Sequence, residues 1–186
     1  TIDSLNLKEE VSYVGHSLGG YVALEAHKLS ESKQQICLFH SNFWADSAQK
    51  KKDRTRIIEI VSRNKNMFIK EAIPNLFNRP TEFLPEVTEL IKDATKIDAE
   101  TIALYTKWMR DRPSNIRYAK SLQSKISVVQ GEFDSVIPLE KMNSFEKIMN
   151  IKVICGVGHM GHIESTNKAK ELILESIQGE TATINN

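Results

Sequence analysis

The sequence predicts an α/β fold with a mostly parallel sheet flanked by helices. Short runs of β-branched and other apolar residues are typical of buried strands, and they recur at residues 11–14, 34–40, 126–130 and 151–155. Helical apolar spacing follows each run, and after the first it begins almost at once. Strands that alternate with helices favour parallel pairing, because each crossover returns the chain to the same end of the sheet.

The first strand leads directly into a Gly-x-Ser-x-Gly motif centred on Ser17. The helical pattern that follows has apolar residues on one face, at Leu18, Val22, Ala26 and Leu29. A serine on such a sharp strand-to-helix turn is strained, and its oxygen stands clear of the sheet. Side chains two residues before and after it would collide, which explains Gly15 and Gly19. The motif predicts a nucleophile, although the bare pattern also occurs as a simple glycine-rich turn.

Candidate partners for Ser17 follow in the order acid, then histidine. The strand at 126–130 ends in a turn that carries two carboxylates, Glu132 and Asp134. The strand at 151–155 leads to a glycine-rich loop that carries two histidines, His159 and His162. A serine hydroxyl is unreactive on its own and needs a base within hydrogen-bond reach, so the histidine loop supplies the candidate bases. His27 and His40 have no positional argument for catalysis.

Three motifs in this order make the sequence similar to the α/β-hydrolase superfamily, and most similar to small, capped serine hydrolases of the carboxylesterase and haloperoxidase-like kind. They are Gly-His-Ser-Leu-Gly-Gly at 15–20, Gly-x-x-Asp-x-x-x-Pro at 131–138 and Gly-His-Met-Gly-His-Ile-Glu at 158–164. The resemblance implies a catalytic triad of Ser17 as nucleophile, Asp134 as orienting acid and His159 as base. The family's spacing favours Asp134 over Glu132, and its Gly-His pair favours His159 over His162.

The resemblance also implies a function and a domain organisation. The implied reaction cleaves a carboxylic ester or thioester of a small, largely apolar substrate through an acyl-enzyme. The implied domains are an α/β-hydrolase core (strands five to eight of the fold) at 1–41 and 123–179, a helical cap at 42–122 and a disordered tail at 180–186. The family's first four strands have no counterpart, so we expect the C-terminal part of a longer protein.

Two parts of the implied active site stay open. One oxyanion donor is expected from the backbone N–H of Leu18, but the second comes in this fold from a loop after the third strand. Because that loop has no counterpart here, we expect weak activity from this chain alone. The pocket is expected to be apolar, or else these side chains pack the cap against itself and the core; the candidates are His16, Phe43, Trp44, Phe68, Phe77, Trp108 and Met109.

The composition is that of an ordinary globular domain, with 186 residues, 40% hydrophobic, 26% charged and a net charge of +1. It gives no indication of a nucleic-acid partner or a membrane span, and no metal or dinucleotide motif predicts a cofactor. Cys37 and Cys155 are expected to be buried free thiols, which favours a cytoplasmic location. The basic run at 49–56 is interpreted as a solvated helix start rather than an anion site. Oligomeric state stays open, and the fold also allows a non-catalytic ligand-binding or interaction module.

Overall fold

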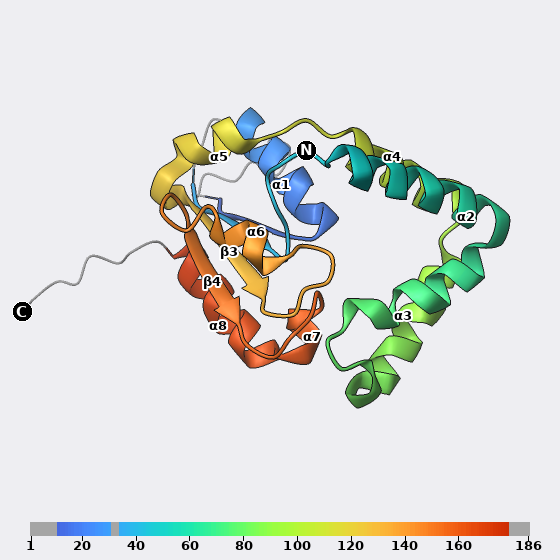
Figure 1. Ribbon diagram of the computed structural model, residues 1–186. Coiled ribbons are helices and arrows are strands. Elements are labelled where there is room, and N and C mark those ends of the chain that lie inside the picture. The colour runs from blue at the N-terminus through green and yellow to red at the C-terminus, as the bar shows by residue number, and fades with distance from the viewer. Residues whose placement is uncertain (1–10, 31–33, 179–186) are drawn as a thin grey trace, which may run out of the picture.

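A sheet of four parallel strands lies at the centre of the computed structural model, which describes residues 11–30 and 34–178 (Figure 1). The strands pair in chain order and are β1 (Tyr13–His16), β2 (Ile36–Phe39), β3 (Ile126–Gly131) and β4 (Asn150–Ile154). Each neighbouring pair is parallel. The predicted α/β fold with a parallel sheet is therefore confirmed. The expected tail at 180–186, and a helix end expected at 4–10, lie outside the described residues.

Every residue of β2 is buried, because helices cover both faces of the sheet. Alternate residues of a strand point to opposite faces, and Ile36 and Leu38 accordingly pack with one cluster while Cys37 and Phe39 pack with another. The first cluster includes residues of α1 (Leu18–Leu29), α5 (Ile116–Leu122) and α6 (Leu139–Asn143). The second lies against α8 (Thr166–Ile177). A short 3₁₀ turn, η4 (Gln123–Lys125), leads from α5 into β3.

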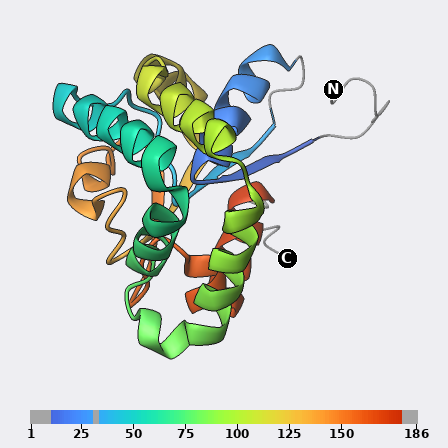
Figure 2. The same cartoon turned by 90° about the vertical axis from the view of Figure 1, so that its right-hand side faces the viewer.

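The region between β2 and α5 is helical and extends away from the sheet, as Figures 1 and 2 show from two directions. Its elements are α2 (Ala48–Ala72), η2 (Pro74–Leu76), η3 (Pro80–Phe83), α3 (Leu84–Lys96) and α4 (Ala99–Asp111). Asn64 interrupts α2 with non-helical dihedrals (φ −152°, ψ 75°). Arg54, within the basic run of α2, is buried and pairs with Asp46 rather than facing solvent. Arg112, just beyond α4, pairs with the same carboxylate at 2.9 Å.

The helical region is joined to the loop that precedes α7 (Gly161–Glu164). Phe77 and Val87 form a buried cluster with Met160 of that loop. Polar contacts reinforce this junction, because the Asn78 backbone N–H donates to the Glu164 carboxylate at 2.8 Å and its side-chain amide donates to a loop carbonyl at 2.9 Å. The helical region therefore helps to hold the loop that carries His159.

Three local predictions are wrong in detail. β1 starts at Tyr13 and runs to His16, because its register against β2 pairs residues 13–16. The buried face of α1 is Gly20, Ala23, Leu24 and His27, not the predicted one. Val22 and Leu29 are 61% and 87% exposed, since the small Gly20 is the residue that lets the helix approach the chain after β2. Cys155 is exposed, because β4 ends one residue before it, whereas Cys37 is buried.

Candidate active site

Ser17 occupies the sharp turn between β1 and α1, with φ 51° and ψ −117°. A positive φ is strained for a residue with a side chain, and such strain is typical of functional sites. The turn is held by its backbone, because the Ser17 N–H donates to the Phe39 carbonyl at 3.0 Å and the Ser17 carbonyl accepts from Ser41 Oγ at 2.7 Å. The strand before and the helix after Ser17 are both present, as the motif requires.

The glycines of the turn have separate roles. A Cβ at Gly15 would lie 2.3 Å from the Gly19 carbonyl oxygen, which confirms the predicted collision before Ser17. The collision predicted after it is wrong, because a Cβ at Gly19 would meet nothing within 4 Å. The tight position is Gly20 instead, where a Cβ would lie 2.2 Å from Ser41 Oγ. The helix start therefore packs against the end of β2 through Gly20.

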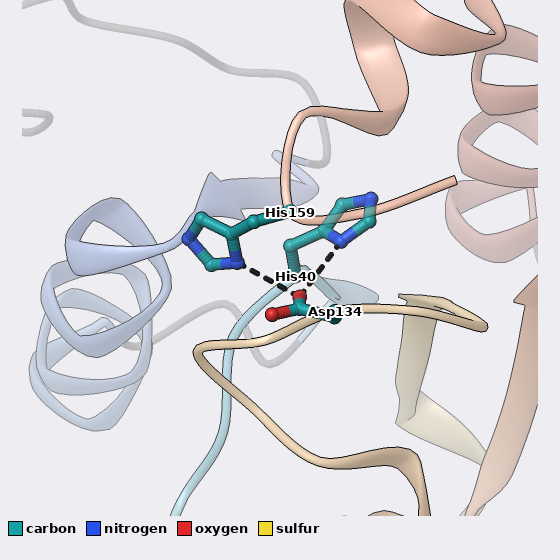
Figure 3. A group of neighbouring side chains, drawn as sticks. All are labelled: His40, Asp134 and His159. Carbon is teal, nitrogen blue, oxygen red and sulfur yellow. Dashed lines mark hydrogen bonds and ion pairs between the residues drawn. The ribbon is translucent and has the colours of Figure 1, made fainter. Parts of the chain in front are cut away.

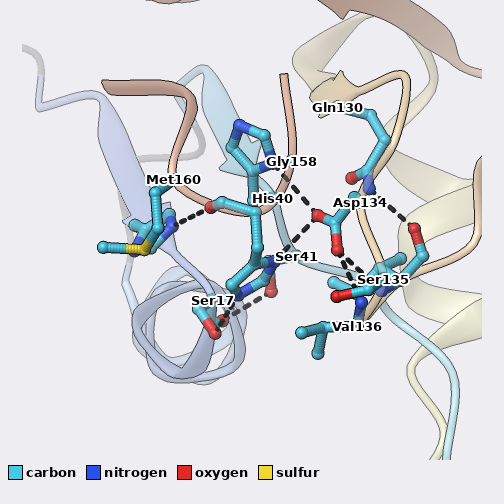
Figure 4. A network of polar contacts seen from close by, with 12 residues as sticks. Ser17, His40, Ser41, Gln130, Asp134, Ser135, Val136, Gly158 and Met160 are labelled. Atoms are coloured by element: carbon cyan, nitrogen blue, oxygen red, sulfur yellow. Dashed lines mark hydrogen bonds and ion pairs between the residues drawn. The ribbon is translucent and has the colours of Figure 1, made fainter. Parts of the chain in front are cut away.

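A chain of hydrogen bonds connects the serine, the histidine and the acid that the motifs predict. Figure 3 shows the contact between His159 and Asp134, and Figure 4 shows Ser17 in the same network. Ser17 Oγ lies 2.9 Å from His159 Nε2, and His159 Nδ1 lies 2.8 Å from Asp134 Oδ2. These residues come from three places in the sequence and meet at the carboxyl ends of β1, β3 and β4. In parallel α/β sheets this edge is where ligands bind.

The turn after β3 fixes the carboxylate of Asp134. Asp134 Oδ1 accepts the backbone N–H groups of Val136 and Ile137, both at 2.9 Å. Gln130 Nε2 donates to the Ile137 carbonyl at 2.8 Å and so braces the same turn. Burial alone would raise the pKa of Asp134, but the hydrogen bonds from His159, His40 and the backbone hold this pKa well below its ordinary value. The carboxylate is therefore buried and ionised.

The loop after β4 places His159 through its backbone. The His159 N–H donates to the Leu76 carbonyl at 2.7 Å, and the Gly158 N–H donates to Glu164 Oε1 at 2.9 Å. A Cβ at Gly158 would lie 2.6 Å from the Asn78 nitrogen, so this close approach of two backbones requires glycine. His159 is 3% exposed, and its orientation is set by contacts on both sides of the ring.

The alternative acid and base lie elsewhere. Glu132 is exposed, and its carboxylate accepts the Gly156 N–H at 2.8 Å. The ring centroids of His162 and His16 lie 4.8 Å apart, and burial lowers the pKa of His162. His16 Nε2–H donates to the His159 carbonyl oxygen at 3.0 Å, and burial lowers the pKa of His16 to about 4. Of the two loop histidines, His159 is the one within hydrogen-bond distance of Ser17.

Sequence reasoning missed His40, which is completely buried beside the triad. Its Nδ1 lies 3.0 Å from Asp134 Oδ2, the same oxygen that contacts His159 (Figure 3). The signal that could have found it is topological. His40 directly follows β2, which lies between β1 and β3, so its side chain is at the same sheet edge as Ser17 and Asp134.

The same three side chains form the candidate metal site among the described residues. One ligand atom from each of His40, Asp134 and His159 lies within 4.8 Å of the others. Both histidine Nδ1 atoms are at hydrogen-bond distance from one carboxylate oxygen. A cation here would have to replace both N–H protons and break the link between His159 and Asp134.

A cavity of about 220 Å³ lies beside the acid turn, between α1, the start of α2 and α6. Trp44 contributes an aromatic wall, and Val136 and Ile137 contribute aliphatic ones. Polar groups also line it, among them Tyr21, Asn42 and Lys141. The cavity is thus small, and both apolar and polar side chains line it.

The predicted pocket residues are distributed over several environments. Trp44 lines the cavity and stacks on Phe145, and Phe43 packs into the core at 2% exposure. Phe77 packs in the cluster with Met160. Trp108 is 56% exposed and lies on the surface of α4. The remaining candidates are partly buried and are His16, Phe68 and Met109.

The chain has the fold of the α/β-hydrolase superfamily, as solved structures of similar fold show. An esterase from Thermogutta terrifontis superposes with a TM-score of 0.81 and 26% identity, over 95% of this chain and 67% of that one. An esterase from Exiguobacterium antarcticum gives 0.80 and 16%, over 96% and 70%. The 2-hydroxy-6-oxo-6-phenylhexa-2,4-dienoate hydrolase of Rhodococcus sp. strain RHA1 gives 0.68 and 17%, over 92% and 65%.

Other comparisons bear on how far this likeness extends. No protein-family model matches the sequence, and no curated protein matches it. The chain spans about two thirds of the length of the solved hydrolases above, from 65% to 70%. The neighbours support hydrolase activity in general and a small-molecule substrate. Nowhere in the described segments is there a helix with the length and hydropathy needed to cross a bilayer.

Proposed function

We propose that this chain carries the triad of a serine hydrolase that cleaves a small, largely apolar carboxylic ester or thioester through an acyl-enzyme. The observation that carries the proposal is the hydrogen-bonded series from Ser17 through His159 to Asp134, at 2.9 Å and 2.8 Å. Distances of this size are those expected between a nucleophile, its base and the group that orients the base. The esterases of similar fold support the same reaction class.

In the proposed reaction Ser17 Oγ attacks the carbonyl carbon of the substrate and gives its proton to His159 Nε2. His159 then transfers that proton to the leaving alcohol or thiol as the tetrahedral intermediate collapses to an acyl-serine. Asp134 stays ionised, keeps the Nδ1–H tautomer of His159 and stabilises the imidazolium, without taking the proton. Water, activated by His159, releases the carboxylic acid and restores Ser17.

The oxyanion of the intermediate needs hydrogen-bond donors. Leu18 is the first residue of α1, so its N–H is one of the unpaired donors at the helix start and is the donor that we propose. Loss of one donor from such a site typically lowers kcat by ~10²–10³. We assign no second donor among residues 11–30 and 34–178, and we therefore propose that this chain is a slow catalyst.

The alternative from another functional class is a ligand-binding or interaction module without catalysis. A binding module has no need of a serine on a strained turn, of a histidine at 2.9 Å from its oxygen, or of a buried ionised acid behind that histidine. The combination favours the hydrolase.

Covalent labelling tests the proposal without requiring full turnover. We expect a fluorophosphonate to modify the folded chain once and the modified peptide to contain Ser17, because the base at Nε2 makes this hydroxyl nucleophilic. His159→Gln should slow labelling strongly, whereas His162→Gln should not, and the two variants differ only in which histidine of the loop is lost. No labelling of the folded chain, or labelling spread over surface serines, would support the binding module.

We propose that the acyl group of the substrate binds in the cavity beside the acid turn, and on this basis we expect selectivity for short acyl groups. A volume of about 220 Å³ is below the range of typical drug-sized ligand sites. We expect kcat/KM for p-nitrophenyl acetate or butyrate to exceed that for the decanoate by at least ~10-fold, since surplus methylenes stay in water or force the walls apart. The check is a series of acyl lengths at concentrations below micelle formation. A rise in kcat/KM with length would show that the acyl chain binds elsewhere.

A further inference from the structure

His40 shares an oxygen with the proposed base. Asp134 Oδ2 is 2.8 Å from His159 Nδ1 and 3.0 Å from His40 Nδ1, so both rings direct a nitrogen at one carboxylate oxygen (Figures 3 and 4). A carboxylate oxygen can only accept, so both nitrogens must be donors. With two N–H donors on Oδ2 and two backbone donors on Oδ1, the carboxylate is fully hydrogen-bonded.

The far side of the His40 ring fixes its protonation state. His40 Nε2 is buried and has no hydrogen-bond partner within the described ranges. A Cβ at Gly161 would lie 2.4 Å from this nitrogen, and one at Gly131 would lie 2.9 Å from the adjacent carbon. The absence of side chains at Gly131 and Gly161 thus leaves room for the His40 ring, and no further group fits between the ring and these two glycines. A proton on Nε2 would be a buried, unpaired donor, which is costly, so the ring is neutral with its proton on Nδ1.

The surroundings of His40 agree with this assignment. Its titratable neighbours are Asp134, His16 and His159, with ring centroids of the two histidines at 5.8 Å and 5.7 Å, and more distantly His162 and Glu164. Burial lowers the pKa of His40, against the opposing effect of Asp134. His40 has φ 44°, a strained conformation that places the ring in this position directly after β2.

We propose that His40 is a positioning residue that acts through Asp134: its neutral Nδ1–H holds Oδ2 in place and competes with His159 for that oxygen. The inference rests on the proposed triad. Because a donated N–H draws charge from the carboxylate, His40 weakens the hold of Asp134 on the imidazolium form of His159.

A matched pair of substitutions separates the N–H from the volume of the side chain. Asn and Leu have nearly the same shape, and only Asn offers an N–H near the position of His40 Nδ1. In His40→Leu we expect kcat/KM for a short ester to fall ~10-fold, because Asp134 Oδ2 loses the donor that holds it in place behind His159. His40→Asn should keep kcat/KM near that of the unsubstituted chain.

A merely structural role for His40 predicts a different pattern, in which His40→Leu and His40→Asn lose activity and stability to the same extent. That pattern would overturn the proposal. Leu is disfavoured at a positive φ, so His40→Leu can lose stability for a reason unrelated to the N–H group. A second measurement therefore uses the unsubstituted chain. Nitrogen-resolved NMR spectra of that chain should show His40 as the Nδ1–H tautomer with a bare Nε2 from pH 5 to 8, and protonation of both nitrogens in that range would also overturn the proposal.

These readouts are independent of the proposed hydrolase activity. The tautomer of His40 is measured on the resting chain, whereas fluorophosphonate labelling reports whether Ser17 is nucleophilic. A chain that labels at Ser17 but shows no difference between His40→Leu and His40→Asn would retain the hydrolase and lose this role of His40. A chain that does not label would lose the hydrolase, whatever the spectra of His40 show.

Discussion

Replacing Asp134 with asparagine is expected to lower the rate of ester cleavage by ~10⁴, with little change in the backbone. The carboxamide presents an NH₂ group as well as an oxygen, and His159 Nδ1 and His40 Nδ1 both need an acceptor on that side. The backbone N–H groups of Val136 and Ile137 keep the amide oxygen on the Oδ1 side, so the NH₂ group faces the two rings and both Nδ1 donors lose their acceptor. His159 then favours the Nε2–H tautomer, which donates to Ser17 Oγ and cannot accept its proton. Single-turnover acylation by a short p-nitrophenyl ester measures this step.

The control for Asp134→Asn is Glu132→Gln, which changes the same charge two residues earlier in an exposed position. We expect that variant to keep its acylation rate within ~2-fold, because Glu132 contacts the Gly156 N–H and not the histidine. An equal loss in both variants would mean that the charge of the turn matters rather than the contact with His159. An unaffected Asp134→Asn would remove Asp134 from the triad.

The depressed pKa of Asp134 also makes the stability of the chain depend on pH. Its folded pKa lies below the value in the unfolded chain, so the ionised carboxylate stabilises the fold at pH values above the unfolded pKa. This contribution is lost as the pH falls through the acidic range toward the folded pKa. The unsubstituted chain should therefore lose more unfolding free energy between pH 4 and pH 2 than Asp134→Asn does, measured by urea denaturation at each pH.

The sequence was sufficient to predict those features that local patterns determine. The strand, the sharp turn and the helix around Ser17 are adjacent in the chain, so one motif predicts all of them. Asp134 and His159 follow strands and lie in glycine-containing turns, and the parallel sheet brings these strand ends to a common edge. The α/β fold and the pairing of Ser17 with His159 rather than His162 could therefore be reached from spacing and resemblance together.

Features that depend on packing between distant segments could not be predicted in this way. His40 has no motif, and its role becomes visible only when β2 is placed between β1 and β3. The buried face of α1 was mistaken because Val22 and Leu29 are more apolar than Gly20 and His27, yet the close approach at Gly20 orients the helix. His27 is buried because its ring has hydrogen-bond partners on both nitrogens, a compensation that hydropathy does not record.

The two glycines that flank Ser17 at equal distance are expected to respond oppositely to alanine. A Cβ at Gly15 would lie 2.3 Å from the carbonyl oxygen and 2.5 Å from the carbonyl carbon of Gly19, and 2.6 Å from Cα of Gly20. These are backbone atoms of the helix start and cannot rotate away as a side chain does. We expect Gly15→Ala to lower the unfolding free energy by about 3 kcal/mol, at the upper end of the cost of overpacking.

Gly19→Ala is the matched control, because a Cβ there meets nothing within 4 Å and the residue is already helical. Alanine favours the helix over glycine by up to about 1 kcal/mol, so this variant should be as stable as the unsubstituted chain or slightly more stable. Urea denaturation of both variants measures the difference, and fluorophosphonate labelling shows whether Ser17 still faces His159. If Gly19→Ala keeps its stability but loses labelling, the open space beside Gly19 is needed by the substrate. Equal destabilisation by both substitutions would contradict the packing asymmetry of the turn and restore the symmetrical collision that the sequence alone predicts.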